Sequence, residues 1–279
     1  MKTLGAVELQ EAEEVLRKQL PKSFKVYGFL HSINRGKPTT LEVVVDSWPD
    51  FKVIICRPDL TNKRVMDYTL KVTIFSTDEQ IFRTMLMQGQ AVDWSLNFLF
   101  AGLDVSNLQM IRDVSASKGV NLKTFTNIAV HLLFLSDISD LNSPSIAGAL
   151  ESRIASLDMS HIDLVNNTWK FGRNDRGYRN IKNLITNFPS FCIKDDQGQP
   201  VSWILVYDYL SIGILHTLPE HRRKGYAKVL VSVLAKRLHA EGYPLYCFVE
   251  EDNTVSYELF KGLGFTEDSS YRAVWLEVN

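Results

Sequence analysis

One strand–turn–helix segment constrains this chain more than any other part of its 279 residues. A run of strand-forming residues over 211–218 leads into the turn Pro219-Glu-His-Arg-Arg-Lys-Gly-Tyr-Ala-Lys, after which helical spacing begins. A basic turn that contains glycine, placed between a strand and a helix, directs backbone N–H groups and the positive helix end toward an anion. The spacing of Arg222, Gly225 and Ala227 favours a pyrophosphate. The segment therefore predicts a site for a phosphate-bearing cofactor.

The bulk composition is that of a globular protein with room for about two domains. Hydrophobic residues make up 45% and charged residues 23%, and the net charge of −1 gives no overall attraction to nucleic acid or to an acidic membrane. Cys56, Cys192 and Cys247 are far apart and form no CxxC pair, so we expect free buried thiols and no metal site.

Targeting signals are not evident in the sequence. The longest apolar runs fall short of the roughly 20 residues that span a bilayer. The acidic start of the chain resembles neither a signal peptide nor a cleavable mitochondrial presequence. We therefore expect a soluble, intracellular protein without a membrane span, and the sequence is silent on its oligomeric state.

The first half of the chain predicts an α/β domain over residues 1–140. Its expected helices cover 8–20, 77–88 and 106–115. Its expected strands cover 24–33, 40–45, 51–55 and 70–75. This alternation suits a degenerate copy of the fold expected in the second half, although the first half contains no basic glycine turn. A polar, turn-rich stretch near 136–150 predicts the linker.

The second half, residues 150–279, predicts the order ααβββαβαβ. Its expected helices cover 161–171, 177–187, 224–240 and 254–263. Its expected strands cover 191–194, 201–207, 211–218, 245–250 and 272–278, the first two forming a hairpin. The strands begin antiparallel and become parallel across one helical crossover. We therefore predict an α/β (α+β) fold with a mixed sheet flanked by helices.

The turn and a second element, Asn253-Thr-Val-Ser-Tyr-Glu-Leu-Phe-Lys-Gly-Leu-Gly-Phe, together resemble the Gcn5-related N-acetyltransferase superfamily. The resemblance implies acyl-CoA as a co-substrate and no permanently bound cofactor. It assigns the backbone of His216, Thr217 and Leu218 to the pantetheine arm, which enters a gap beside that strand. Asn253 is assigned a side-chain contact along the arm, and it is equally suited to cap a helix. The pyrophosphate is assigned to the turn, namely Arg222, Arg223, Lys224, Gly225, Tyr226 and Ala227.

Proton transfer is expected to involve Glu220. An amine nucleophile is protonated at neutral pH and must lose a proton before it attacks a thioester. Glu220 lies at the mouth of the turn, and a partly dry cleft raises the pKa of a carboxylate toward neutrality. His216 and His221 are rival bases, and a glutamate here also favours a helix N-terminus. Where the superfamily often has a tyrosine as general acid, this chain has Phe260, which cannot donate a proton. Either the thiolate departs without a general acid, or another residue such as Tyr257 donates the proton.

A narrower resemblance covers nearly the whole chain. Val44-Val-Asp-Ser-Trp-Pro-Asp-Phe, His161-Ile-Asp-Leu-Val-Asn-Asn-Thr-Trp-Lys-Phe-Gly-Arg and Thr217-Leu-Pro-Glu-His-Arg are similar to segments of the glycine N-acyltransferase family. The family transfers acyl groups from acyl-CoA to the amino group of glycine, or of glutamine in some members. It is associated mainly with mitochondria, and its proposed catalytic glutamate falls on Glu220. The expected partners are therefore small molecules, acyl-CoA and an amino acid.

An amino-acid acceptor also carries a carboxylate, which a guanidinium binds well. Arg173 and Arg176, with Asn167 and its neighbour Asn166, are the candidates, although an ordinary solvated loop explains them equally. Trp169, Trp203 and Tyr207 are candidates for an acyl pocket or for the core. Two other functions fit the same sequence: acetylation of a protein or peptide amine, and non-catalytic binding of acyl-CoA.

Overall fold

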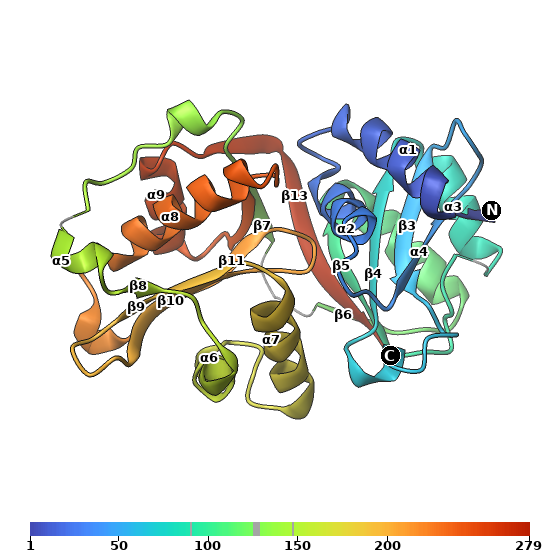
Figure 1. Ribbon diagram of the computed structural model, residues 1–279. Helices are drawn as coiled ribbons and strands as arrows, with labels where there is room; N and C mark the ends of the chain where they lie inside the picture. The colour runs from blue at the N-terminus through green and yellow to red at the C-terminus, as the bar shows by residue number, and fades with distance from the viewer. Residues whose placement is uncertain (90, 125–128, 147) are drawn as a thin grey trace. The chain divides into compact units, whose positions relative to one another are not determined.

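The computed structural model describes residues 1–279 except residues 90, 125–128 and 147, and it comprises two compact units (Figure 1). Unit 1 consists of Met1–Leu132, Glu250–Asp252 and Asp268–Asn279; unit 2 consists of Leu133–Val249 and Asn253–Glu267. The units differ from the predicted domains, 1–140 and 150–279, mainly at the C-terminus. The reason is strand pairing, because β13 (Thr266–Val278) pairs with β5 (Phe98–Asp104) of the first half.

Unit 1 opens with two helices, α1 (Ala6–Arg17) and α2 (Phe24–Asn34). An antiparallel meander follows, made of β2 (Leu41–Val45), β3 (Val53–Pro58) and β4 (Lys71–Ser76). Helix α3 (Glu79–Met87) then leads to β5, which lies parallel to β4, and α4 (Leu108–Ser117) follows. The strand order is β1-β2-β3-β4-β5-β13, in which β1 is Lys2–Thr3, and β6 (Leu122–Thr124) also pairs with β13.

Helix α2 corrects one sequence prediction, because residues 24–33 were expected to form a strand. Every residue from Phe24 to Ser32 is buried. A helix that is buried on all sides shows no clear 3.6-residue period of apolar residues, so its aromatic and β-branched residues resemble a strand. The other predicted strands and helices of the first half are confirmed to within a few residues. Strands β1, β5, β6 and β7 (Val130–Phe134) were not predicted.

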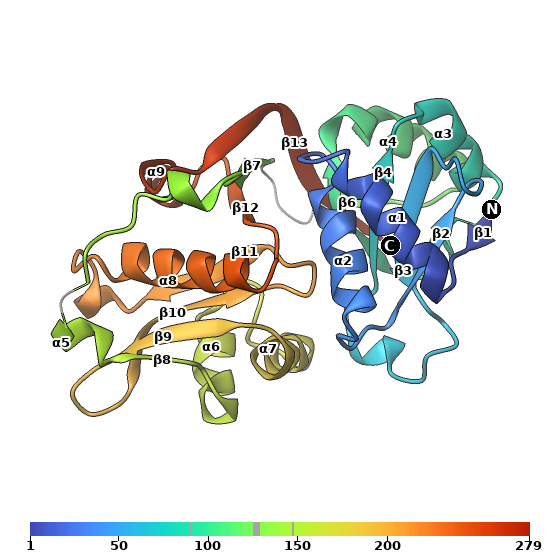
Figure 2. The ribbon, with the colours of Figure 1, turned by 45° about the horizontal axis from the view of Figure 1, so that its top comes forward.

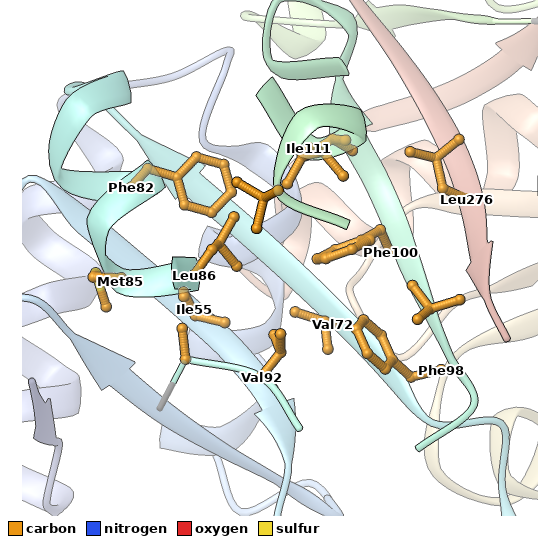
Figure 3. Close-up of a cluster of buried hydrophobic side chains, with 14 of the residues drawn as sticks. Ile55, Val72, Phe82, Met85, Leu86, Val92, Phe98, Phe100, Ile111 and Leu276 are labelled. Atoms are coloured by element: carbon orange, nitrogen blue, oxygen red, sulfur yellow. The ribbon is translucent and has the colours of Figure 1, made fainter. Parts of the chain in front are cut away.

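The hydrophobic core of unit 1 lies between its sheet and the helices α3 and α4 (Figure 3). Strand residues Ile55, Val72 and Phe100 face helix residues Phe82 and Ile111, and all five are buried. Each such side chain contributes roughly 1.5–3 kcal/mol when it leaves water. Figures 1 and 2 show α1 and α2 on the opposite face of this sheet.

Unit 2 has the strand order β12-β11-β10-β9-β8. Strand β7 (Val130–Phe134), whose last two residues belong to unit 2, lies next to β12. The strands are β8 (Ile154–Ala155), β9 (Ser190–Lys194), β10 (Pro200–Val206), β11 (Ile212–Thr217) and β12 (Tyr246–Glu250). The helices are α5 (Gly148–Glu151), α6 (Ile162–Thr168), α7 (Asp175–Asn187), α8 (Tyr226–Ala240) and α9 (Thr254–Gly262). Helix α8 covers one face of the sheet, and α6 and α7 cover the other (Figures 1 and 2).

The predicted order ααβββαβαβ is confirmed in the second half of the chain. Strands β9, β10 and β11 are antiparallel, and β12 is parallel to β11 across the α8 crossover. Unit 1 contains the same series, with α1, α2, β2, β3, β4, α3 and β5 in place of α6, α7, β9, β10, β11, α8 and β12. The two units therefore share the order of these elements and the directions of these strands.

The three cysteines are free and buried, as expected. Burial raises the pKa of Cys192 to about 11, and it raises the pKa values of Cys56 and Cys247 further. Since the thiolate is the reactive form, we expect a chromogenic disulfide reagent at pH 8 to label no thiol quickly in the native protein. In denaturant it should label all three. A thiol that reacts quickly in the native protein would contradict this packing.

Candidate functional site

The site begins where two parallel strands of unit 2 diverge. Strand β11 pairs with β12 at Ile212, which lies opposite Cys247, and β11 then continues to Thr217. On its other side β11 stays paired with β10 as far as Thr217, which lies opposite Ser202. The half of β11 that leads to the turn therefore has one edge paired with β10 and one edge that pairs with no strand among the described residues.

The backbone of β11 is strained at the point of divergence. Ile214 has φ +50°, in the left-handed region that a β-branched residue rarely adopts. The pairing of β10 with β11 shifts at the same level, between Trp203 and Leu205. Gly213 precedes Ile214 and allows the Tyr207 ring to approach, because a Cβ there would lie 2.3 Å from Tyr207 Cε2. Strain of this kind is concentrated at functional sites.

Beyond the strained residue, alternate peptide groups of β11 point to opposite edges. The Leu218 N–H donates to the Val201 carbonyl at 2.9 Å, so it faces β10. The N–H and the carbonyl group of Thr217 itself therefore face the open edge. There the Thr217 carbonyl accepts a hydrogen bond from Arg222 Nε at 3.1 Å. An extended ligand with its own amide groups could pair with this edge as a further strand does.

The turn after β11 leads to a helix N-terminus that has no side-chain cap. Gly225 occupies the N-cap position with φ +77°, and Arg223 has φ +61°. Glycine adopts this conformation without the cost that other residues incur. Glycine has no side chain that accepts hydrogen bonds from the first N–H groups of α8. These N–H groups therefore stay available to a ligand. Arg222, Arg223 and Lys224 are exposed around them, which suits an anionic ligand.

The equivalent helix of unit 1 is built in the opposite way. Helix α3 begins after Asp78, whose carboxylate accepts from the Ile81 N–H at 2.9 Å. Glu79 adds a second negative charge in the first turn. A helix end already capped by one carboxylate and flanked by another repels phosphate. Of the two topologically equivalent helices, only α8 is suited to hold a pyrophosphate.

Three candidate bases lie at the end of β11 and in the short 3-10 turn Pro219–His221. Glu220 is exposed and forms no hydrogen bond or ion pair within the described chain. His216 stacks on the buried Trp203 ring, with centroids 5.0 Å apart. Partial burial and the charge of Arg222 lower the pKa of His216. His221 Nδ1 is buried and has no hydrogen-bond partner among the described residues.

The second predicted element is built around the start of α9. The Asn253 side chain accepts from the Ser256 N–H at 3.1 Å, so Asn253 caps α9. Phe260 is buried against Phe265, with ring centroids 5.1 Å apart. The Tyr257 hydroxyl donates to Glu267 Oε2 at 2.6 Å. The cap leaves the amide group of Asn253 as a donor toward a ligand.

The predicted acceptor residues all lie in the loop and helix end between α6 and α7. Arg173, Arg176 and Asn167 are exposed, and Arg173 Nε donates to the Asn167 carbonyl at 3.0 Å. Arg173 has φ +66°, and its N–H donates to the buried Asn166. In the described chain these three residues form no hydrogen bond or ion pair with the turn at Glu220.

The three predicted aromatic residues come from two segments of unit 2. Trp203 is fully buried in β10, and Tyr207 stacks on Tyr209 with centroids 5.1 Å apart. Trp169 lies in the α6–α7 loop against Phe171. The strained Ile214 and the pairing of Trp203 with His216 were missed by sequence reasoning. Both depend on register, for which the sequence carries no local signal.

Two family profiles match the chain in succession. Residues 1–189 match the profile of the family described as aralkyl acyl-CoA:amino acid N-acyltransferase, and residues 191–276 match that of FR47-like proteins. The chain is 30% identical to the glycine N-acyltransferase of Rattus norvegicus over 269 residues, which cover 91% of each protein.

Solved structures share the fold across both units. A Drosophila protein superimposes with a TM-score of 0.79 at 17% identity, covering 100% of this chain and 98% of that one. A GCN5-related N-acetyltransferase from Kribbella flavida superimposes with a TM-score of 0.54 at 12% identity, covering 92% and 93%. The predicted fold class is confirmed. With the match over residues 1–189 and the likeness to the rat enzyme, the chain belongs to the aralkyl acyl-CoA:amino acid N-acyltransferase family.

Proposed function

We propose that this protein transfers an acyl group from acyl-CoA to the amino group of glycine, with glutamine as the alternative acceptor. The uncapped N-terminus of α8 carries the proposal, since it lies beside the open edge of β11 and is surrounded by arginine and lysine. The turn holds the pyrophosphate through Arg222, Arg223, Lys224 and the backbone from Gly225 to Ala227. The open edge of β11, from His216 to Leu218, receives the pantetheine arm, and Asn253 contacts it.

The reaction proceeds by direct attack. Glu220 removes a proton from the ammonium group of the acceptor, and the free amine then attacks the thioester carbonyl carbon. A C–N bond forms, the C–S bond breaks, coenzyme A leaves as its thiolate, and the attacking nitrogen releases its second proton to water to give the neutral amide. The Glu220 carboxylate is exposed and forms no hydrogen bond with another described residue, so it is free to meet the acceptor. All three cysteines are buried, which favours this route over an acyl-enzyme.

The leaving thiolate departs without a protein acid. Phe260 cannot donate a proton, and the proton of the Tyr257 hydroxyl is directed at Glu267. A thiol has an ordinary pKa of about 8.5, so its thiolate is a stable leaving group near neutral pH. Phe260 therefore occupies the position at which related enzymes often have a tyrosine. Its buried ring packs against Phe265.

The acceptor carboxylate is assigned to Arg173, Arg176 and Asn167. Each is exposed, and Arg176 forms no hydrogen bond or ion pair with another described residue. A guanidinium binds a carboxylate with two parallel hydrogen bonds. We also propose a mitochondrial location, on family resemblance; no helix among the described residues is long and apolar enough to cross a membrane.

A coenzyme A release assay tests this function. Thiol release is measured over a matrix of acyl-CoA donors and amines, including glycine, glutamine, other amino acids and short peptides. We expect release with glycine or glutamine and none without an amine. Release with peptides but not with amino acids would indicate a protein acetyltransferase instead. Tight binding of acyl-CoA with no release for any amine would indicate a non-catalytic binding protein.

A further inference from the structure

Arg153 lies directly before β8, and its guanidinium group faces the first residue of α8. The guanidinium carbon is 5.8 Å from the centre of the Tyr226 ring, within the range of a cation–π contact. Tyr226 immediately follows Gly225 in the basic turn and is the first residue of α8. A cation from far earlier in the sequence is therefore in contact with the end of the turn.

The topology of unit 2 explains this contact. Strands β8, β9, β10 and β11 are antiparallel in succession, so the start of β8 and the ends of β9 and β11 meet at one edge of the sheet. At that edge Arg153 Nε donates to the Lys194 carbonyl at 2.5 Å, and the Lys194 N–H donates to the Arg153 carbonyl at 3.0 Å. Figures 1 and 2 both show α5, which ends two residues before Arg153, at the N-terminal end of α8.

The guanidinium group of Arg153 is held in place, but only part of its hydrogen-bonding capacity is occupied. Its Nε is engaged by Lys194, and the Tyr226 ring packs against it. Within the described chain its two terminal amino groups form no hydrogen bond or ion pair, although the side chain is half-buried. A guanidinium binds phosphate with two parallel hydrogen bonds, and one already fixed in orientation loses little entropy on binding.

We propose that Arg153 binds a phosphate group of the coenzyme, together with the turn at the start of α8. This inference rests on the proposed function, since it assumes that the turn holds coenzyme A. It differs from the assignment of Arg222, Arg223 and Lys224, which are exposed side chains of the turn itself. Arg153 is supplied by another segment, oriented before the ligand arrives.

The test is the affinity of the full chain for coenzyme A and for 3′-dephospho-coenzyme A, measured by calorimetry. We expect Arg153→Gln to weaken binding of coenzyme A by about 10- to 100-fold, the usual range for a hydrogen bond to a charged group. Loss with coenzyme A alone identifies the 3′-phosphate, and equal loss with both identifies the pyrophosphate. Unchanged affinity for both ligands would overturn the inference.

The matched control is Arg237→Gln, in the last turn of the same helix, where Arg237 pairs with Glu241. This variant should bind coenzyme A like the wild type. A second measurement uses the wild type, in case Arg153→Gln does not fold: coenzyme A should slow modification of Arg153 by phenylglyoxal and leave Arg237 unprotected. Equal labelling of Arg153 with and without coenzyme A contradicts the inference. Failure of the wild type to bind coenzyme A contradicts the proposed function itself.

Discussion

Replacing Glu220 with glutamine is expected to lower kcat at pH 7 by about 10²- to 10⁴-fold, the usual contribution of a general base. The variant should recover rate as the pH rises toward about 10, because there the acceptor amine loses its proton to water without help. The KM for acyl-CoA should stay the same or fall, since a negative charge is removed beside a basic turn. Steady-state kinetics from pH 6 to 10 measure all three quantities.

Two other roles for Glu220 give different results. If it only favours the N-terminus of a helix, Glu220→Gln should lower stability by about 0.3–1 kcal/mol and leave the pH profile unchanged. If His216 or His221 is the base, His216→Gln or His221→Gln should show the recovery in alkali instead. Glu241→Gln, at the far end of α8, is the matched control and should behave like the wild type. A full rate at pH 7 in Glu220→Gln would exclude this residue as the base.

Replacing Glu13 with alanine is expected to lower the free energy of unfolding by about 3 kcal/mol. Glu13 is buried between α1 and α2, where its carboxylate accepts from His31 Nδ1 at 2.8 Å, Asn34 Nδ2 at 2.7 Å and Arg35 at 3.0 Å. Its removal leaves donors of three side chains without their acceptor. Glu14→Ala is the matched control. Glu14 is exposed and, among the described residues, its ion pair is with Arg17, so a loss of about 0.5 kcal/mol is expected.

The same cluster predicts a loss of stability in acid. Burial alone would raise the pKa of Glu13, but the hydrogen bonds from His31 and Asn34 and the charge of Arg35 outweigh it and lower the pKa from 4.5 to about 2. A carboxyl group with a lowered pKa in the folded state stabilises the protein above its unfolded pKa and loses that effect as the pH falls toward the folded value. At about 1.4 kcal/mol per pKa unit, the loss between pH 5 and 2 is about 3 kcal/mol.

Chemical denaturation of the wild type and Glu13→Gln at pH 7, 4 and 2 measures this effect. The difference in unfolding free energy between the two proteins should be largest at pH 7 and shrink toward pH 2. A difference that is independent of pH would show that the cluster stabilises through packing alone. Because Glu13 lies in unit 1, the measurement does not depend on the acyl-CoA site.

Tertiary contacts decided several features that local patterns did not reveal. Helix α2 resembled a strand because it is buried on every side, and residues 268–279 joined unit 1 because β13 pairs with β5. The strain at Ile214 depends on how β10 and β11 are paired. The contact of Arg153 with Tyr226 depends on the order of four strands. In each case the deciding partner lies far away in sequence, so no short window of residues contains the information.

The turn at residues 219–228 shows what the sequence determined by itself. Its basic charge, its glycine at a left-handed position and its place between a strand and a helix are all local properties, and each is found in the structure. Charge and backbone freedom belong to single residues, so they can be read before the chain is folded. Only the tertiary structure decided that β12 diverges from β11 beside this turn and that the equivalent helix of unit 1 is closed by Asp78. A binding site needs such surroundings, because its contacts come from residues that folding alone brings together.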